Sequence, residues 1–444
     1  MPYMPGNGGD MRRMRTVSGA VLAAVLGLAL TACTTSTTTI VRPTGSGSGT
    51  ASAGSSSAKP SASASPSPTG PLVTIAPGSG ATGADPSQGI AVTTADGTLK
   101  NVTVTTAGDP VTGTYAAGRK SWHSVYALDV SQSYSVTATA TSATGATTTK
   151  TAHFRTLTPK STVTAEIFEG YQQTYGVGMP IILTFSQPIT NKAAVEKSIQ
   201  LTTSKRVVGA WYWDGNETLD FRPRDFWPAN TTVSFAGHFN GVLAAPGRYG
   251  YHTLTQTFAI GQSVIAVAST QTHRTQIYIN GKLTYNWPIS SGKPGDATPD
   301  GSYLTIEKAN PVRMVGPGYN LLVPWSVRFT FSGDYYHDAY WSVGEQGFEN
   351  VSHGCVNLSP ADAMTYYKLA VPGDPITITG SPRPGTWDNG WTEWFLFWNQ
   401  LLAGSALHEA VVATPQGSTF VPPSALRPNT AKAPLGTAAA GNDL

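Results

Sequence analysis

The 444-residue sequence predicts a mainly β protein made of several domains. Thr, Ser, Gly and Pro are abundant, which favours strands, turns and linkers over helical bundles. Runs of alternating apolar and polar residues, separated by turn residues, recur between residues 72 and 380. The length exceeds that of one ordinary domain of ~100–150 residues, so we expect three folded domains with tails.

Charge and cysteine content exclude several classes of protein. Charged residues make up 12% of the chain and the formal net charge is +3, so we expect no nucleic-acid partner. The chain has two cysteines, Cys33 and Cys355. Because Cys33 has a separate explanation in the N-terminal segment, Cys355 has no intramolecular partner, and a disulfide framework is excluded.

The N-terminal segment, residues 1–33, predicts export and lipid anchoring. Three arginines between residues 12 and 15 precede an apolar run over 17–30, which is shorter than the ~20 residues of a membrane-spanning helix. The run ends in Leu30-Thr31-Ala32-Cys33, which resembles a bacterial lipobox. We therefore expect a lipidated Cys33 at the extracytoplasmic face of the cell membrane. An ordinary signal peptide with an incidental cysteine is the alternative.

Residues 34–262 predict a tether followed by two β domains. From 34 to 71 the chain is almost wholly Ser, Thr, Ala, Gly and Pro, which cannot bury enough apolar surface to fold. Two strand-rich segments follow, 72–158 and 161–262, and similar patterns at their ends suggest tandem β-sandwiches. Aromatic residues of the second, such as Trp211, favour a sandwich core, with glycan stacking as the alternative.

A third strand-rich region covers residues 263–380. Its evenly spaced strands predict a barrel or sandwich, with one helix over 360–369 that Ser359 caps. The Gly-rich stretch from Met314 to Tyr319 predicts a flexible connection that could lie over a groove.

Beyond the third region the sequence predicts a helical subdomain and a disordered tail. Tryptophans between 381 and 410 recur at helical spacing, which predicts one amphipathic helix packed on the third domain. A helix on the membrane surface is the alternative. From 411 to 444 the chain is again rich in Ala, Pro, Thr and Gly, and we expect disorder.

The residues that carry chemistry lie in Ser352-His353-Gly354-Cys355-Val356-Asn357 and in the preceding His337. A cysteine nucleophile must become a thiolate, and a nearby imidazole can accept its proton. His337 and His353 are both candidates for that base. Gly354 permits a sharp turn and leaves N–H groups free to face an oxyanion. The arrangement predicts acyl transfer.

Two other interpretations of these residues remain open. His337, His353 and Cys355 could bind zinc with Asp338 as a fourth ligand, although no second Cys or His pair completes the site. Alternatively, Cys355 is a buried and inert cysteine.

His337, fourteen intervening residues and then 352–357 resemble the signature of L,D-transpeptidases, whose catalytic domain is of the YkuD type. The resemblance covers roughly residues 263–380 and includes the segments 298–301, 340–347 and 359–363. More loosely, the whole chain resembles the actinobacterial members. These are lipoproteins with two immunoglobulin-like domains before the catalytic domain and a short Trp-rich C-terminal subdomain after it.

The resemblance implies a reaction on peptidoglycan. In that family the cysteine attacks the third residue of a tetrapeptide stem and releases D-alanine, and an amine of a neighbouring stem then takes the acyl group to give a 3→3 cross-link. By position, Cys355 is the nucleophile and His337 is the base, oriented by a backbone carbonyl near Asp338. His353 and Gly354 would lie around the oxyanion.

The resemblance also implies the substrates, the inhibitors and the binding residues. Donor and acceptor stem peptides are the expected partners, and carbapenem β-lactams the expected covalent inhibitors. The resemblance implies no metal and no organic cofactor. A silent peptidoglycan-binding lipoprotein and an L,D-carboxypeptidase are the alternative functions. The residues expected to contact substrate or brace the site are Met314, Tyr319, Trp341, Ser352 and Asn357.

This chain departs from the family pattern at two positions. Asp338 follows His337 where a small residue is common, so we expect its carboxylate to raise the imidazole pKa and favour an ion pair with Cys355. Only four residues separate Met314 from Tyr319, fewer than in a typical lid, so we expect a more open groove.

Overall fold

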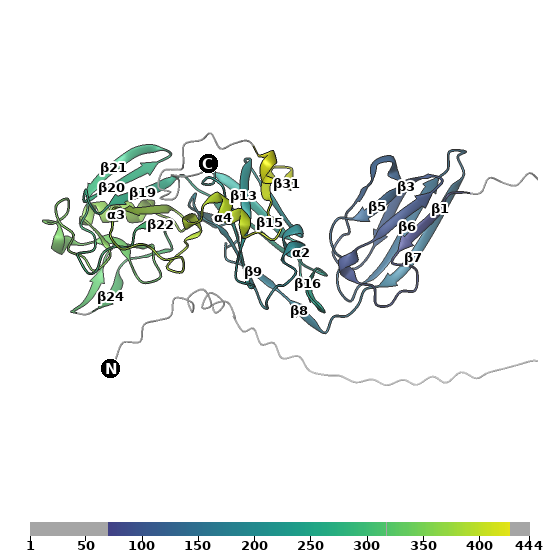
Figure 1. Ribbon diagram of the computed structural model, residues 1–444, viewed down its shortest axis with the longest axis horizontal. Helices are drawn as coiled ribbons and strands as arrows, with labels where there is room; N and C mark the ends of the chain where they lie inside the picture. Colours follow the sequence, from purple (N-terminus) through teal and green to yellow (C-terminus); the bar gives the residue numbers. More distant parts are fainter. Residues whose placement is uncertain (1–69, 317, 427–444) are drawn as a thin grey trace, which may run out of the picture.

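The computed structural model describes residues 70–316 and 318–426. Figure 1 shows the β domains following one another along the chain, from purple-blue through teal to green. The mainly β class is confirmed. Cys33 and the tether up to residue 69 lie outside the described residues. Within those residues, no helix has both the length and the apolar character needed to cross a membrane.

The first domain is a sandwich of two antiparallel sheets, with strand orders β1-β2-β5-β4 and β3-β6-β7. In β6 the residues Tyr134, Val136, Ala138 and Ala140 are buried and alternate with less buried neighbours, as expected for a strand with one face on a core. The elements are β1 Leu72–Ala76, η2 Pro86–Gln88, β2 Ala91–Ala95, β3 Thr98–Thr105, β4 Gly113–Tyr115, η3 Ala117–Arg119, β5 Ser121–Ser124, β6 Ser133–Thr141 and β7 Thr147–Arg155.

The second domain contains a ten-stranded sheet and a smaller sheet of order β16-β17-β8. Trp211, Phe221 and Trp227 are buried in its core, which confirms the packing interpretation of these aromatics. The elements are β8 Ser161–Val163, β9 Ala165–Ile167, β10 Thr174–Tyr175, β11 Ile181–Phe185, α2 Lys192–Lys197, β12 Ile199–Thr203, β13 Val207–Asp214, β14 Thr218–Pro223, β15 Thr231–Gly237, β16 Leu243–Ala245, β17 Arg248–Gly250 and β18 Leu254–Ile260.

The ten-stranded sheet includes two strands from the end of the chain. β30 (Ala410–Thr414) lies between β12 and β13, parallel to the first and antiparallel to the second, and β31 (Gly417–Val421) pairs with β30. A 3-10 turn, η6 (Pro423–Ala425), follows. The prediction of disorder from residue 411 is therefore wrong as far as 426. The Ala, Pro, Thr and Gly of this region hid a short strand, Ala-Val-Val-Ala-Thr, whose β-branched residues favour pairing. Residues 427–444 lie outside the described residues.

The Trp-rich segment is not one helix. It forms only η5 (Glu393–Phe395) and α4 (Trp398–Ala403). Trp394 is buried in the core of the second domain, where its Nε1 donates to Gly178 O at 2.8 Å. Leu401 and Leu402 pack against Ala210 of β13. The predicted packing on the third domain is thus largely wrong, because the larger aromatic core lies in the second domain.

The third domain packs a five-stranded sheet, β21-β20-β19-β29-β22, against a four-stranded sheet, β23-β26-β27-β28. The predicted helix is α3 (Pro360–Leu369), and Ser359 caps it by accepting from Asp362 N–H. Its strands and its 3-10 turn are β19 Val264–Ser269, β20 Arg274–Ile279, β21 Lys282–Pro288, β22 Gly301–Leu304, β23 Glu307–Ala309, β24 Val312–Gly316, β25 Tyr319–Val323, β26 Ser326–Arg328, β27 Tyr335–Asp338, η4 Tyr340–Ser342, β28 Val356–Leu358 and β29 Pro375–Thr379.

The predicted flexible connection after Met314 is instead part of an antiparallel hairpin. β24 and β25 pair in register, with Met314 opposite Leu321 and Gly316 opposite Tyr319. Alternation in β25 places Tyr319, Leu321 and Val323 on one face. The sequence did not predict these two strands, whereas the expectation that the stretch lies over a groove agrees with Met314 and Tyr319 lining a cavity of the third domain.

Candidate active site

Strand pairing brings the two halves of the sequence motif together. β27 and β28 are parallel neighbours, and His337 lies opposite Asn357. Val356 and Leu358 are fully buried in the core of the third domain. Because side chains alternate along a strand, Cys355 and Asn357 face away from that core, on the same side as His337.

A cavity of about 360 Å³ lies on this side of the strands. Eight of the nine residues predicted for the site line it; Gly354 does not. Five further lining residues were not predicted. The eight are Met314, Tyr319, His337, Trp341, Ser352, His353, Cys355 and Asn357, and the five are Leu321, Val323, Ser342, Glu345 and Val351. The alternating pattern of β25 could have predicted Leu321 and Val323.

His337 is buried and held by its neighbour. Its Nδ1 lies 2.8 Å from Asp338 O, and since a carbonyl only accepts, Nδ1 carries the proton and Nε2 keeps its lone pair. This is the backbone contact that the resemblance implied. Burial lowers the pKa of His337 to about 4. The carboxylate of Asp338 accepts from Tyr340 N–H at 3.1 Å, so the expectation that it raises the imidazole pKa is wrong.

The thiol of Cys355 faces the turn before β27. Its Sγ lies 3.9 Å from Gly333 O. Although the residue keeps part of its surface exposed, burial of the sulfur raises the pKa of Cys355 to about 12, and the charge of Asp334 adds to the shift. At neutral pH the resting pair is therefore a thiol beside a neutral imidazole, and proton transfer must accompany attack.

This protonation state predicts how alkylation of Cys355 depends on pH. In the Cys33→Ala variant, the rate with iodoacetamide should rise about tenfold per pH unit between about pH 6 and 9, as the thiolate fraction does well below its pKa. Mass spectrometry of the alkylated peptide measures this rate. A rate that stays level across neutral pH would instead indicate a preformed ion pair.

Ser352 and Thr298 hold the loop that carries the cysteine. Ser352 Oγ donates to Cys355 O at 2.6 Å and accepts from Gly354 N–H at 3.1 Å. Thr298 Oγ1 donates to Gly354 O at 2.7 Å. The Gly354 N–H is therefore engaged within the loop, contrary to the expectation that it faces an oxyanion. Asn357 donates from Nδ2 to Ser342 Oγ at 2.8 Å and so braces the site, as the resemblance implied.

Asp334 is a buried carboxylate next to Cys355, and the sequence did not predict it. Its Oδ2 accepts from Thr330 Oγ1 at 2.7 Å and from Ser332 Oγ at 3.1 Å. Its Oδ1 lies so close to Gly354 that a Cβ there would stand 2.3 Å away. Asp334 thus holds the turn before β27, which contains Gly333, in close contact with Gly354.

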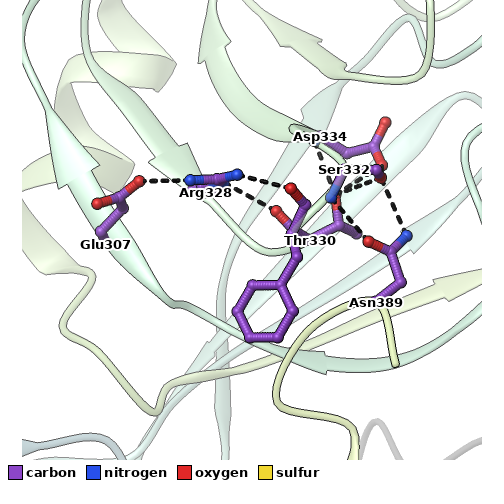
Figure 2. Close-up of polar contacts among 7 residues, drawn as sticks. Glu307, Arg328, Thr330, Ser332, Asp334 and Asn389 are labelled. Carbon is purple, nitrogen blue, oxygen red and sulfur yellow. Dashed lines mark hydrogen bonds and ion pairs between the residues drawn. The ribbon is translucent and has the colours of Figure 1, made fainter. Parts of the chain in front are cut away.

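A wider polar network fixes the same turn, as Figure 2 shows. Arg328 donates to Thr330 O at 2.9 Å and to Phe331 O at 2.7 Å, and it also pairs with Glu307 at 2.9 Å. From the C-terminal segment, Asn389 accepts from Ser332 N–H at 2.7 Å. The C-terminal segment therefore supports the catalytic turn from outside the third domain.

His353 occupies the edge of the cavity. Lys293 Nζ lies 2.9 Å from its Nε2, and since an ammonium only donates, this nitrogen accepts the hydrogen bond. Its ring lies 5.1 Å from the ring of Tyr319. Because Nε2 is engaged, His337 is better placed than His353 to act as the base. In residues 70–316 and 318–426, no three His, Cys, Asp or Glu side chains form a metal-binding group, as the zinc interpretation requires.

Comparison with known proteins covers both the site and the domains before it. Residues 263–378 match the L,D-transpeptidase catalytic domain (YkuD), and residues 81–243 match a bacterial Ig domain. A solved structure of an L,D-transpeptidase in complex with imipenem is 34% identical, covers 50% of this chain and all of that chain, and has a TM-score of 0.43.

Curated relatives extend the similarity over most of the chain. L,D-transpeptidase 5 of Mycobacterium tuberculosis (strain H37Rv) is 31% identical over 76% of this chain and 77% of its own length. L,D-transpeptidase 2 of M. tuberculosis (strain CDC 1551) is 33% identical over 350 residues, which are 76% of this chain and 85% of that relative. With a match of this extent, and with the catalytic domain holding the cavity, the chain belongs to the L,D-transpeptidase family.

Proposed function

We propose that this protein forms 3→3 cross-links in peptidoglycan through an acyl-enzyme on Cys355. The observation that carries the proposal is the shared cavity of Cys355 and His337, in which Asp338 O fixes the imidazole with its unprotonated Nε2 available. Membership of the L,D-transpeptidase family supports acyl transfer in general. The choice of nucleophile, donor and linkage is the proposal.

The first half of the reaction loads the enzyme. Cys355 Sγ bonds to the carbonyl carbon of the third stem residue while His337 Nε2 takes the thiol proton. The bond from that carbon to the D-alanine nitrogen then breaks, and the imidazolium gives its proton to the leaving amine. Burial favours this second transfer, because the low pKa of His337 makes its imidazolium a ready proton donor.

The second half transfers the acyl group. The amine of a neighbouring stem bonds to the acyl carbon, the C–S bond breaks, and a proton returns to the sulfur through His337. The energy of the original amide is conserved in the thioester and then in the new amide, so no other energy source is needed.

The walls of the cavity suit a peptide donor. Met314 and Tyr319 of the hairpin provide an apolar wall, and Trp341 places a half-exposed ring 5.9 Å from the ring of His337. A stem peptide can place its backbone between these surfaces and reach the thiol. A carbapenem, as a strained cyclic amide, would enter as a substitute donor and leave Cys355 acylated.

Location follows from the N-terminal segment. We propose that Cys33 is lipidated at the extracytoplasmic face of the cell membrane and that the following tether links this anchor to the β domains. The catalytic domain would then work on peptidoglycan some distance from the membrane.

Product analysis tests the proposed function. The purified protein is incubated with a disaccharide–tetrapeptide and the products are identified by mass spectrometry. We expect free D-alanine together with a dimer whose fragmentation places the new amide between two third residues. Free D-alanine with only tripeptide would assign an L,D-carboxypeptidase, and no release of D-alanine would favour a silent binding protein.

A further inference from the structure

Among the described residues that line the catalytic cavity, Glu345 is the only carboxylate. The other lining groups are apolar side chains, hydroxyls, imidazoles, an amide and the thiol. Glu345 is partly buried and follows the turn η4 that carries Trp341.

The backbone holds Glu345 in a fixed relation to the nucleophile. Its N–H donates to Ser342 O at 3.3 Å, and its carbonyl accepts from Phe348 N–H at 3.0 Å. Ser342 Oγ in turn accepts from Asn357 Nδ2, two residues after Cys355. Two hydrogen bonds therefore connect the backbone of Glu345 to the strand that follows the cysteine.

The carboxylate of Glu345 has no structural role in the described part of the chain. There it forms neither a hydrogen bond nor an ion pair with any other residue. In contrast, Asp334, the buried carboxylate next to Cys355, is used by Thr330 and Ser332. Glu345 thus places a negative charge, uncompensated by any described residue, in the space that substrate enters.

We propose that Glu345 binds the amine of the acceptor stem peptide, an inference that rests on the proposed function. Of the two substrates, only the acceptor must bring an amine to the cysteine, and this amine is an ammonium ion before reaction. The donor instead ends in the carboxylate of D-alanine, which Glu345 repels.

The role of Glu345 is recruitment and orientation, and the chemical step is unchanged. The bound ammonium releases one proton to water before attack. The neutral nitrogen then bonds to the acyl carbon, the C–S bond breaks, and the second proton reaches the sulfur through His337. Glu345 therefore affects how often the acyl-enzyme is captured by an amine and not by water.

The test compares Glu345→Gln with the wild type in both halves of the reaction. Acylation is followed by intact mass with the disaccharide–tetrapeptide donor alone. Capture is followed as the ratio of dimer to released D-alanine while a second substrate is increased. This substrate is a disaccharide–tripeptide, which has a side-chain amine but no D-alanine and so acts only as an acceptor. We expect the variant to be acylated at the wild-type rate. It should need a roughly tenfold higher acceptor concentration before half of the acyl-enzyme is captured by the amine and half is hydrolysed, which is the effect expected for the loss of one charged hydrogen bond.

Two further variants make the comparison specific. Glu349→Gln removes an exposed carboxylate from the same loop that does not line the cavity, and it should leave the partition unchanged. Glu345→Asp keeps the charge and should restore part of the capture. An unchanged partition in Glu345→Gln would overturn the inference. Slower acylation in that variant, with an unchanged melting temperature, would overturn it too, because it would place Glu345 in the donor half.

Failure of the proposed function gives a different result. If the wild type forms no acyl-enzyme with the donor, the proposed function falls and the inference falls with it. If the wild type forms the acyl-enzyme, and Glu345→Gln loses the same fraction of it to hydrolysis as the wild type does, the proposed function stands and only the role of Glu345 is lost.

Discussion

Replacing Cys355 with alanine is expected to abolish acylation. The wild-type protein should gain the mass of one carbapenem, and Cys355→Ala should gain none. Without the sulfur no thioester can form, so donor turnover should fall by at least about a thousandfold, the scale seen when a covalent nucleophile is removed. Intact mass spectrometry measures the adduct, and release of D-alanine measures turnover.

The other cysteine of the chain provides the matched control for this loss. Cys33→Ala removes a thiol that is outside the cavity-bearing domain, and it should keep the full adduct. The stability change in Cys355→Ala should be small, about 1 kcal/mol, because only one sulfur atom is removed from a partly exposed position. An adduct that persists in Cys355→Ala would assign the nucleophile to another residue.

Replacing Gly354 with alanine is expected to remove most of the activity and part of the stability. Gly354 has φ of 126°, which L side chains rarely adopt, and a Cβ would stand 2.3 Å from Asp334 Oδ1. Asp334 cannot easily move, because Thr330 and Ser332 donate to its other oxygen. The backbone strain alone costs about 1–3 kcal/mol. Relief of the contact must displace either the catalytic turn or Cys355, so acylation should slow as well.

Two comparisons separate backbone strain from steric contact at Gly354. Gly281 has φ of 80°, and a Cβ added there would meet open space among the described residues, so Gly281→Ala should lower the melting temperature without slowing acylation. Adding Asp334→Ala to Gly354→Ala should recover part of the lost acylation by removing the contact. If Gly354→Ala acylates at the wild-type rate, the fit between Asp334 and Gly354 does not position the nucleophile.

The features that the sequence predicted well depend on local patterns. Period-two alternation in segments such as β6 predicts strands, and it holds wherever one face meets a core. The cavity residues His337 and Cys355 were also predictable, because they lie in one short motif whose two halves pair as neighbouring strands.

The features that could not be predicted from the sequence depend on residues that are distant along the chain. β30 is a strand because β13 pairs with its residues 411–413 and β31 pairs along its whole length, while β12 joins it only at Thr414. Trp391 and Trp394 recur at helical spacing, yet their burial sites are set by the second domain. No motif or spacing in the sequence distinguishes Glu345 from other acidic residues in loops. Only the folded structure shows that it lines the cavity.

Because β30 and β31 belong to the sheet of the second domain, that sheet can be completed only late in the synthesis of the chain. Leu201 N–H bonds to Ser418 Oγ, 217 positions later, so the whole catalytic domain is synthesised before that sheet can close. Until then β12 and β13 present unpaired edges, which are templates for association with other chains. The catalytic domain is thus enclosed between two parts of a single folding unit, and a chain that stops after residue 380 would lack both its C-terminal support and an intact neighbouring sheet.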